Sequence, residues 1–157
     1  MKIYDCFMYF DEDVVLDVRL NFLNKFVDKF IIVESQYNHK GEKRLPQFSI
    51  NKFMKFKDKI KYILIDEIPE GIENIIEGDD RKTIYGKSIH NAWKRENLQR
   101  NKIIKGLTDV DKEDWIIISD LDEIPNLREV KFENIKNELI FFKQDMMYYK
   151  FNLKLKN

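Results

Sequence analysis

The chain has 157 residues, of which 43% are hydrophobic, so it is long and apolar enough to form one ordinary domain with its own core. Its 28 Lys and Arg residues balance 28 Asp and Glu residues, which argues against a nucleic-acid-binding protein, because such proteins usually carry a basic excess. The single cysteine, Cys6, excludes an internal disulfide, and its apolar surroundings predict a buried thiol. No run approaches the ~20 apolar residues of a transmembrane segment, and the N-terminus lacks a signal-peptide pattern, so we expect a cytoplasmic protein.

Strand-like segments recur along the chain. Four runs rich in β-branched and aromatic residues are predicted to be strands, at residues 2–10, 30–34, 60–69 and 115–119. Two later apolar runs are predicted to add an antiparallel edge, at residues 138–143 and 146–155. Polar segments containing Gly or Pro predict loops between several of these runs, one of them reaching from the third strand to about residue 87.

The first predicted helix follows the first strand. Asp11 or Asp13 could cap its N-terminus. The three- and four-residue spacing of apolar side chains predicts one buried face, formed by Val15, Val18, Phe22 and Phe26. A shorter helix or turn is predicted at residues 51–58.

A second helix is predicted from Ser88, a plausible N-cap, to Gly106, a plausible C-terminal stop. After the fourth strand, Asn126 and Glu129 resemble the capping box of a short helix. Helices that alternate with apolar strands predict an α/β fold with a mixed, mostly parallel sheet and helices on both faces. No linker interrupts the sequence, so we expect a single domain over residues 1–157.

The most informative motif is the acidic loop DLDEIPN, which directly follows the apolar run WIIIS. In an open α/β sheet, ligands bind at the carboxyl ends of the strands, where this loop is predicted to lie. Asp120 and Asp122 are two residues apart, so in an extended segment their side chains point the same way. Paired carboxylates suit Mg²⁺ or Mn²⁺ bound together with a substrate phosphate. The alternative is a solvated surface turn, because D-x-D alone is common.

The second motif is KRENLQRN in the predicted second helix. Arg95 and Gln99 share one helical face, as do Glu96 and Arg100. One interpretation is an exposed Glu96–Arg100 ion pair, which contributes little to stability. The other is that Arg100 and Asn101 approach a nucleotide diphosphate, for which arginine is a natural partner.

The third motif is VESQYNHKGE. Glu34 ends a predicted strand, so it would face the same crevice as Asp120 and could accept hydrogen bonds from a ribose or a base. The alternative is a carboxylate paired with Lys40 or Arg44. His39 could orient a substrate, or it could be a solvated loop histidine. The spacing of the two histidines and Cys6 does not match a zinc site.

Three stretches together resemble glycosyltransferase family 17, the family of β-1,4-mannosyl-glycoprotein 4-β-N-acetylglucosaminyltransferases. They are IYDCFMYFDEDVVLDVRLNFLNKFVDKFIIVES, WKRENLQRN and DWIIISDLDEIPN. The resemblance implies a GT-A-like, Rossmann-like fold, a nucleotide-sugar donor such as UDP-GlcNAc, a glycan acceptor and inverting transfer assisted by Mn²⁺ or Mg²⁺.

The resemblance also implies roles for residues of this sequence. Asp120 and Asp122 match the D-x-D pair that holds the metal, with Glu123 beside them. Asp122 and Glu123 are therefore the candidate catalytic residues, and Glu123 is the fallback candidate for the general base that an inverting transfer needs. The candidate nucleotide-sugar-binding residues are Glu34, His39, Arg95, Arg100, Asn101 and Asp120.

The family's domain is longer than this chain, so we expect the chain to be its N-terminal, donor-binding part, truncated at the C-terminus. Three alternatives stay open: an inactive donor-binding module that needs a partner, a metal-dependent phosphotransferase or phosphohydrolase, and a non-enzymatic α/β interaction domain. The second would want a nucleophilic Asp or a Gly-rich phosphate loop, and the five scattered glycines form no such loop.

Overall fold

The computed structural model of the chain describes residues 1–147, 153 and 154. The chain divides into two compact units, Met1–Asp122 and Glu123–Asn157. The first unit contains the whole sheet, and the prediction of one nucleotide-sugar-binding domain over the full length stays a prediction.

The sheet has four strands in the order β3-β2-β1-β4. Their bounds are β1 Ile3–Tyr9, β2 Lys29–Ser35, β3 Ile60–Ile65 and β4 Trp115–Ile118. All three pairings are parallel, which confirms the predicted α/β fold with a mostly parallel sheet, but the described strands include no antiparallel edge. β3 ends at Ile65, whereas the sequence predicted a strand to residue 69, because the pairing with β2 ends at Ile65 and residues 66–69 have no regular structure.

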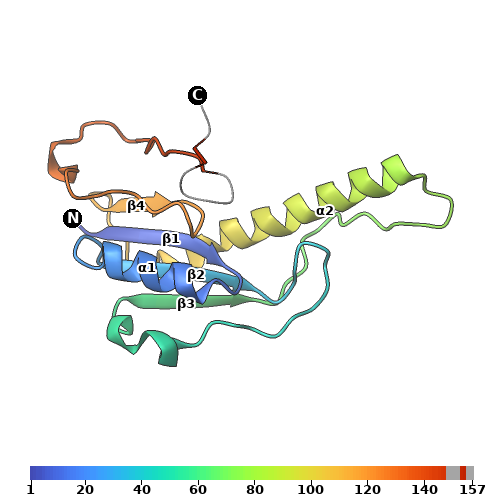
Figure 1. The fold of residues 1–157 in the computed structure, drawn as a ribbon, viewed down its shortest axis with the longest axis horizontal. Helices are drawn as coiled ribbons and strands as arrows, with labels where there is room; N and C mark the ends of the chain where they lie inside the picture. The colour runs from blue at the N-terminus through green and yellow to red at the C-terminus, as the bar shows by residue number, and fades with distance from the viewer. Residues whose placement is uncertain (148–152, 155–157) are drawn as a thin grey trace. The chain divides into compact units, whose positions relative to one another are not determined.

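Helix α1 (Asp13–Leu23) covers one face of the sheet (Figure 1). Its buried residues are Leu16, Arg19, Leu20 and Leu23. The predicted apolar face was wrong: Val18 is 52% exposed, and Phe26 lies beyond the end of the helix. The buried stripe is rotated because it is centred on Arg19, a charged residue that the apolar pattern did not count.

The other face of the sheet packs against the 3-10 helix η2 (Lys102–Gly106), so helices cover both faces as predicted. A buried cluster lies here, formed by Tyr4, Cys6, Ile31, Val33, Ile65 and Ile103. Gly106 lies so close to β2 that a Cβ atom on it would be 2.3 Å from Ile31 Cγ2. Cys6 is fully buried as predicted, and this burial raises the pKa of its thiol.

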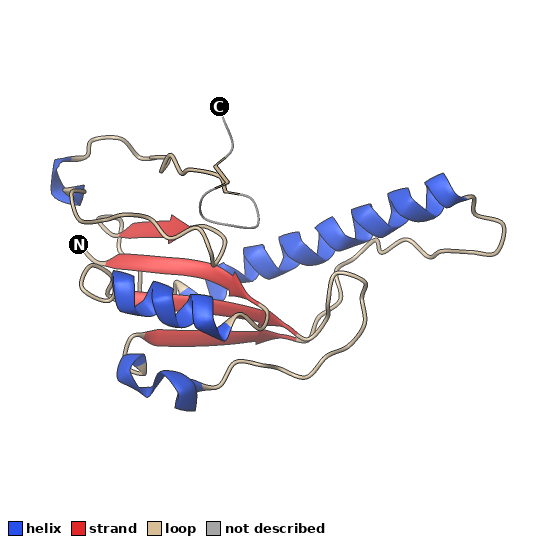
Figure 2. Cartoon of the chain, viewed as in Figure 1, coloured by secondary structure: helices blue, strands red, loops and turns tan. Residues whose placement is uncertain are grey.

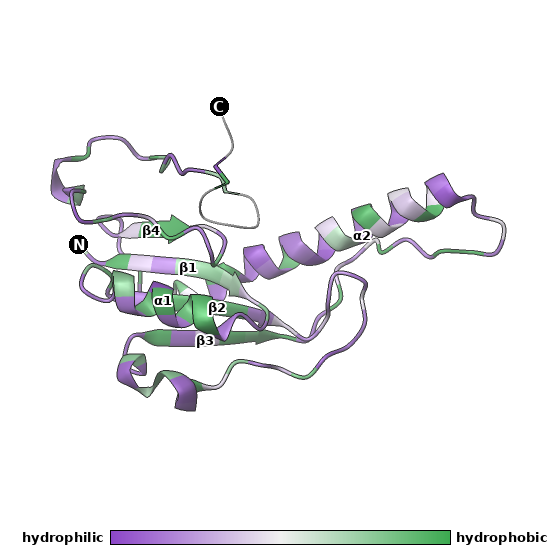
Figure 3. Cartoon of the chain, in the orientation of Figure 1, coloured by the Kyte–Doolittle hydropathy of each residue, from purple (hydrophilic) through white to green (hydrophobic). Residues whose placement is uncertain are grey.

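Helix α2 (Arg81–Asn101) begins before the predicted Ser88 and ends before the predicted Gly106, which is instead the last residue of η2; α2 projects beyond the sheet (Figure 1). Its N-cap is Asp80, whose carboxylate accepts a hydrogen bond from Thr83 N at 2.7 Å. The predicted N-cap, Ser88, lies inside the helix, and its hydroxyl donates to Ile84 O. Figure 3 shows that α2 is mainly hydrophilic, which explains why apolar periodicity located its first turns poorly.

Two further cap predictions were wrong. The N-cap of α1 is Glu12 rather than Asp11 or Asp13, and it makes no side-chain cap bond. Its carboxylate instead accepts from the backbone N–H groups of Phe10 and Asp11, both at 3.0 Å. No helix follows Asn126 directly, because its side chain accepts from Arg128 N in a turn.

The short helix predicted at residues 51–58 is confirmed as η1 (Ile50–Phe56). The second unit contains the 3-10 turn η3 (Phe132–Asn134) and is otherwise loop in its described part (Figure 2). Residues 138–143 are not a strand, because no described segment pairs with them, and Phe141 is 88% exposed. Of the strand predicted at 146–155, residues 148–152 and 155 lie outside the described residues; Met147 and Lys154 form an isolated bridge.

None of the helices in the described part of the chain combines the length and the apolar character needed to cross a membrane.

Candidate functional site

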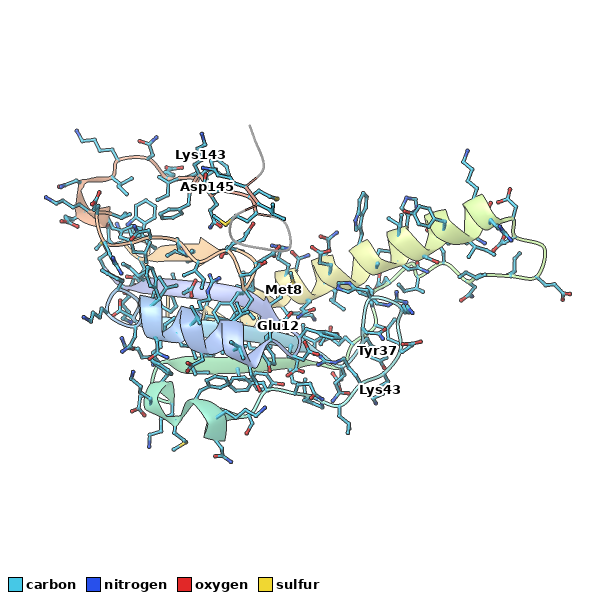
Figure 4. The ribbon with its side chains drawn as sticks, viewed as in Figure 1. Met8, Glu12, Tyr37, Lys43, Lys143 and Asp145 are labelled. Atoms are coloured by element: carbon cyan, nitrogen blue, oxygen red, sulfur yellow. The ribbon has the colours of Figure 1, made fainter. Side chains whose placement is uncertain are left out.

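A pocket of about 440 Å³ opens at the carboxyl ends of β1 and β4. Its volume is within the range of small-molecule sites. The polar lining consists of Glu12, His39, Glu96, Gln99, Asp120 and Asp122. Met8 and Glu12, which are labelled in Figure 4, belong to the end of β1 and the start of α1. Four carboxylates in one pocket favour a bound cation, because they repel one another without one.

The structure brings Asp120 and Asp122 to this same pocket, while the intervening Leu121 is buried and anchors the loop. Two exposed carboxylates fit an ion such as Mg²⁺ that completes its shell with water and phosphate oxygens. Within the described residues, no three His, Cys, Asp or Glu side chains form a group that could hold a metal. Glu123 is exposed and begins the second unit.

The buried side chain of Arg19 is hydrogen-bonded to the backbone of the acidic loop. Its Nη1 donates to the carbonyl oxygens of Asp120 at 2.7 Å and Leu121 at 3.0 Å. Its Nη2 donates to Ser119 Oγ at 2.7 Å. The same guanidinium makes two bonds to the Asp5 carboxylate, at 2.8 Å from Nε and 2.7 Å from Nη2.

This ion pair was not predicted from the sequence, although the sequence contains a signal for it. Asp5 interrupts the apolar run of the first strand, and Arg19 interrupts the leucine stripe of the first helix. Both side chains are fully buried, and charged residues are almost never buried without a partner. Opposite charges at two core positions of adjacent elements therefore predict a buried ion pair.

Arg100 joins the helix α2 to the acidic loop. Its Nη2 donates to Glu96 Oε1 at 3.0 Å and to Asp120 Oδ1 at 3.1 Å. Partial burial opposes its charge, but the hydrogen bonds to the two carboxylates outweigh this effect and raise the pKa of Arg100. The Glu96–Arg100 ion pair is thus present, and Arg100 also contacts Asp120, whereas the approach of Arg100 and Asn101 to a nucleotide diphosphate stays a prediction. Asn101 is exposed at the end of α2 and does not line the pocket.

Two other side chains of α2 are bonded to β2 and to the loop that follows it. Gln99 Nε2 donates to Val33 O at 2.8 Å, and Arg95 Nη1 donates to His39 O at 2.9 Å. Gly41 has a φ of 87° and leaves room for the Arg95 guanidinium, which a Cβ atom would meet at 2.4 Å. Arg95 therefore supports the loop that brings His39 to the pocket.

Glu34 is fully buried, and its carboxylate accepts four hydrogen bonds. The donors are Arg44 Nη1, Gln47 N, Phe48 N and Tyr62 Oη, at 3.0, 2.7, 3.1 and 2.8 Å. Burial, together with the bond to Glu34, raises the pKa of Tyr62. The structure therefore contains the predicted pairing with Arg44, and the carboxylate anchors the loop after β2. Figure 4 shows Tyr37 and Lys43 of that loop, which form an isolated antiparallel bridge.

A four-stranded parallel sheet with helices on its faces makes the first unit an α/β domain compatible with a Rossmann-like fold, and the acidic pocket lies at the carboxyl ends of its strands. The sequence model of Glycosyltransferase family 17 matches residues 1–156, and the chain therefore belongs to that family. No curated protein and no solved structure matches the chain. Membership of a glycosyltransferase family implies a sugar donor and an acceptor.

Proposed function

We propose that the pocket binds a nucleotide-sugar, with UDP-GlcNAc as the first candidate, and that the protein transfers the sugar to a hydroxyl of a glycan with inversion at the anomeric carbon. The observation that supports this proposal is that Asp120 and Asp122 line one pocket of a family 17 chain and that Arg100 is hydrogen-bonded to Asp120. Two carboxylates and an arginine at a sheet edge are the groups that bind a metal–diphosphate unit.

Asp120 and Asp122 would hold Mn²⁺ or Mg²⁺. When bound, the ion supplies Lewis-acid stabilisation of the charge that develops on the departing diphosphate. Arg100 provides a second, permanent positive charge at the same edge of the pocket. Glu96 keeps the guanidinium of Arg100 oriented toward Asp120.

The charges of the pocket make donor binding depend on a divalent ion. Glu12, Glu96, Asp120 and Asp122 contribute four acidic groups to the lining, and the guanidinium of Arg100 is bonded to one of them, Asp120. A nucleotide diphosphate is itself anionic, so the pocket without a cation would repel it. We therefore expect little donor binding without the metal and strong binding with it.

An inverting transfer also needs a base for the acceptor hydroxyl. Glu96 is ion-paired with Arg100, which makes its carboxylate a weaker proton acceptor and less suited to this role. Glu12 is held through Oε2 by two backbone N–H groups, and Oε1 makes no hydrogen bond within the described residues. We therefore add Glu12 to Glu123 as a candidate base, and we expect Glu12→Gln to lower kcat while donor affinity changes little.

Titration calorimetry of UDP-GlcNAc, with and without Mn²⁺, tests the proposal. Wild type is expected to bind only with the metal, and Asp122→Ala is expected to lose this binding. Glu77→Ala is a matched control, because Glu77 is an exposed acid outside the pocket. Absence of binding to UDP, UDP-GlcNAc and other UDP-sugars by wild type would refute the proposal. Binding without transfer to any glycan would identify an inactive donor-binding module.

A further inference from the structure

Arg19 is fully buried, in a helix whose other buried residues are leucines. Five of its hydrogen bonds join two parts of the fold: the carboxylate of Asp5 in the middle of β1, and the three consecutive residues 119–121, where the chain leaves β4 and enters the acidic loop. We propose that the Asp5–Arg19 pair is the positioning device that aims the carboxylates of the acidic loop into the pocket.

The geometry of the guanidinium carries this proposal. Arginine presents its five N–H donors in one rigid plane, so fixing one side of the group fixes the other. Nε and one Nη2 hydrogen are fixed by Asp5, and Asp5 lies in a central strand with neighbours on both sides. The position of Nη1 is therefore set, and Nη1 in turn sets the carbonyl directions of Asp120 and Leu121.

The carbonyl directions decide where the acidic side chains point. A peptide plane links each carbonyl to the next residue, so fixing the carbonyls of Asp120 and Leu121 constrains the Cα positions of residues 120 to 122. The two carboxylates are then preorganised before any ligand binds. Preorganisation of this kind reduces the ordering cost of binding.

Stability alone does not explain these contacts. A buried ion pair is often replaced by apolar residues of similar volume without loss of stability. A lysine could also neutralise Asp5, but its ammonium group has no planar fork that could reach the carboxylate and both carbonyls. The positioning role predicts that such replacements leave the fold intact and loosen the loop.

Two variants separate these roles: the double variant Asp5→Val/Arg19→Met, which replaces the pair by apolar groups, and Arg19→Lys, which keeps the charge. Hydrogen exchange of the amides of residues 119–122 is the first measurement. We expect exchange about tenfold faster in both variants, because two bonds from a charged donor are lost. Exchange at residues 30–34 of β2 is expected to stay as in wild type. Ser119→Ala is the matched control, because both carbonyl contacts remain.

The second measurement is Mn²⁺-dependent UDP affinity, which rests on the proposed function. We expect it to fall about tenfold in both variants while the melting temperature stays close to that of wild type, a combination that a merely structural role would not produce. Failure of wild type to bind UDP would refute the proposed function, whereas the exchange experiment tests the positioning role independently.

A folded variant whose loop exchanges as slowly as wild type would overturn the proposal. If the double variant does not fold, the exchange measurement on Arg19→Lys tests the positioning role alone. If neither variant folds, ¹⁵N NMR of the Arg19 side chain in the wild-type protein tests whether the guanidinium is fixed. Restricted rotation, with separate Nη resonances, supports simultaneous bonding of Arg19 to Asp5 and to residues 119–121. A single averaged resonance refutes it.

Discussion

Replacing Gly106 with alanine tests how closely η2 packs on the sheet. The added Cβ atom would lie 2.3 Å from Ile31 Cγ2 and 3.2 Å from Ile63 Cδ1. Ile31 is fully buried in a strand with neighbours on both sides, so it cannot move aside and η2 must retreat. Overpacking of this kind costs about 1–3 kcal/mol of the free energy of unfolding.

Gly86 offers a matched control with the opposite expected sign. It lies inside α2, and a Cβ atom on it would meet nothing within 4 Å. Gly86→Ala should therefore raise the free energy of unfolding by about 0.5–1 kcal/mol through helix propensity. Urea denaturation followed by circular dichroism measures both changes. A Gly106→Ala protein as stable as wild type would refute the packing argument, as would equal losses in the two variants.

Three further predictions concern charged groups of the first unit. Glu34→Gln should lower the free energy of unfolding by about 3 kcal/mol, because an amide cannot accept four hydrogen bonds; an unchanged urea midpoint would contradict this. Backbone hydrogen bonds from Asp111 and Lys2 lower the pKa of Asp114 in the folded protein below the ordinary value of 3.8. The ionised carboxylate therefore stabilises the folded state at pH values above 3.8, and this stabilisation is lost as the pH falls through the lower pKa of the folded state. Asp114→Asn should therefore flatten the acid side of the stability profile, and a profile parallel to that of wild type would refute the assignment. Arg95→Ala should speed tryptic cleavage in the loop that carries His39, whereas Lys94→Ala, which removes a bond to Gly71 instead, should not.

The parallel sheet and the position of the acidic loop were predictable because they depend on local signals. Each strand is a short apolar run, and the register of the sheet places the end of β4 beside the end of β1. Asp120 and Asp122 come within four residues of the end of β4, so their place at the sheet edge required no knowledge of tertiary contacts.

The remaining features depend on contacts between distant segments. Helix α2 begins before the predicted Ser88, and its buried Asn91 exchanges two hydrogen bonds of 2.8 Å with the backbone of Glu73. Such tertiary contacts hold a helix whose own apolar pattern is weak. In the same way, the place of Glu12 in the pocket and the four bonds of Glu34 follow from chain segments that meet only in the folded state.

The central place of β1 has a consequence for the order of folding. Its pairing with β2 joins segments close in sequence, whereas its pairing with β4 joins residues about as far apart as Lys2 and Asp114, 112 positions along the chain. Contacts of such long range form late, because closing a long loop costs more entropy. Until β4 pairs with β1, Arg19 can bind the carboxylate of Asp5 but cannot donate hydrogen bonds to the three acceptors of residues 119–121. During synthesis, the sheet can therefore start without its acidic loop, and the pocket is the last part of the first unit to be completed.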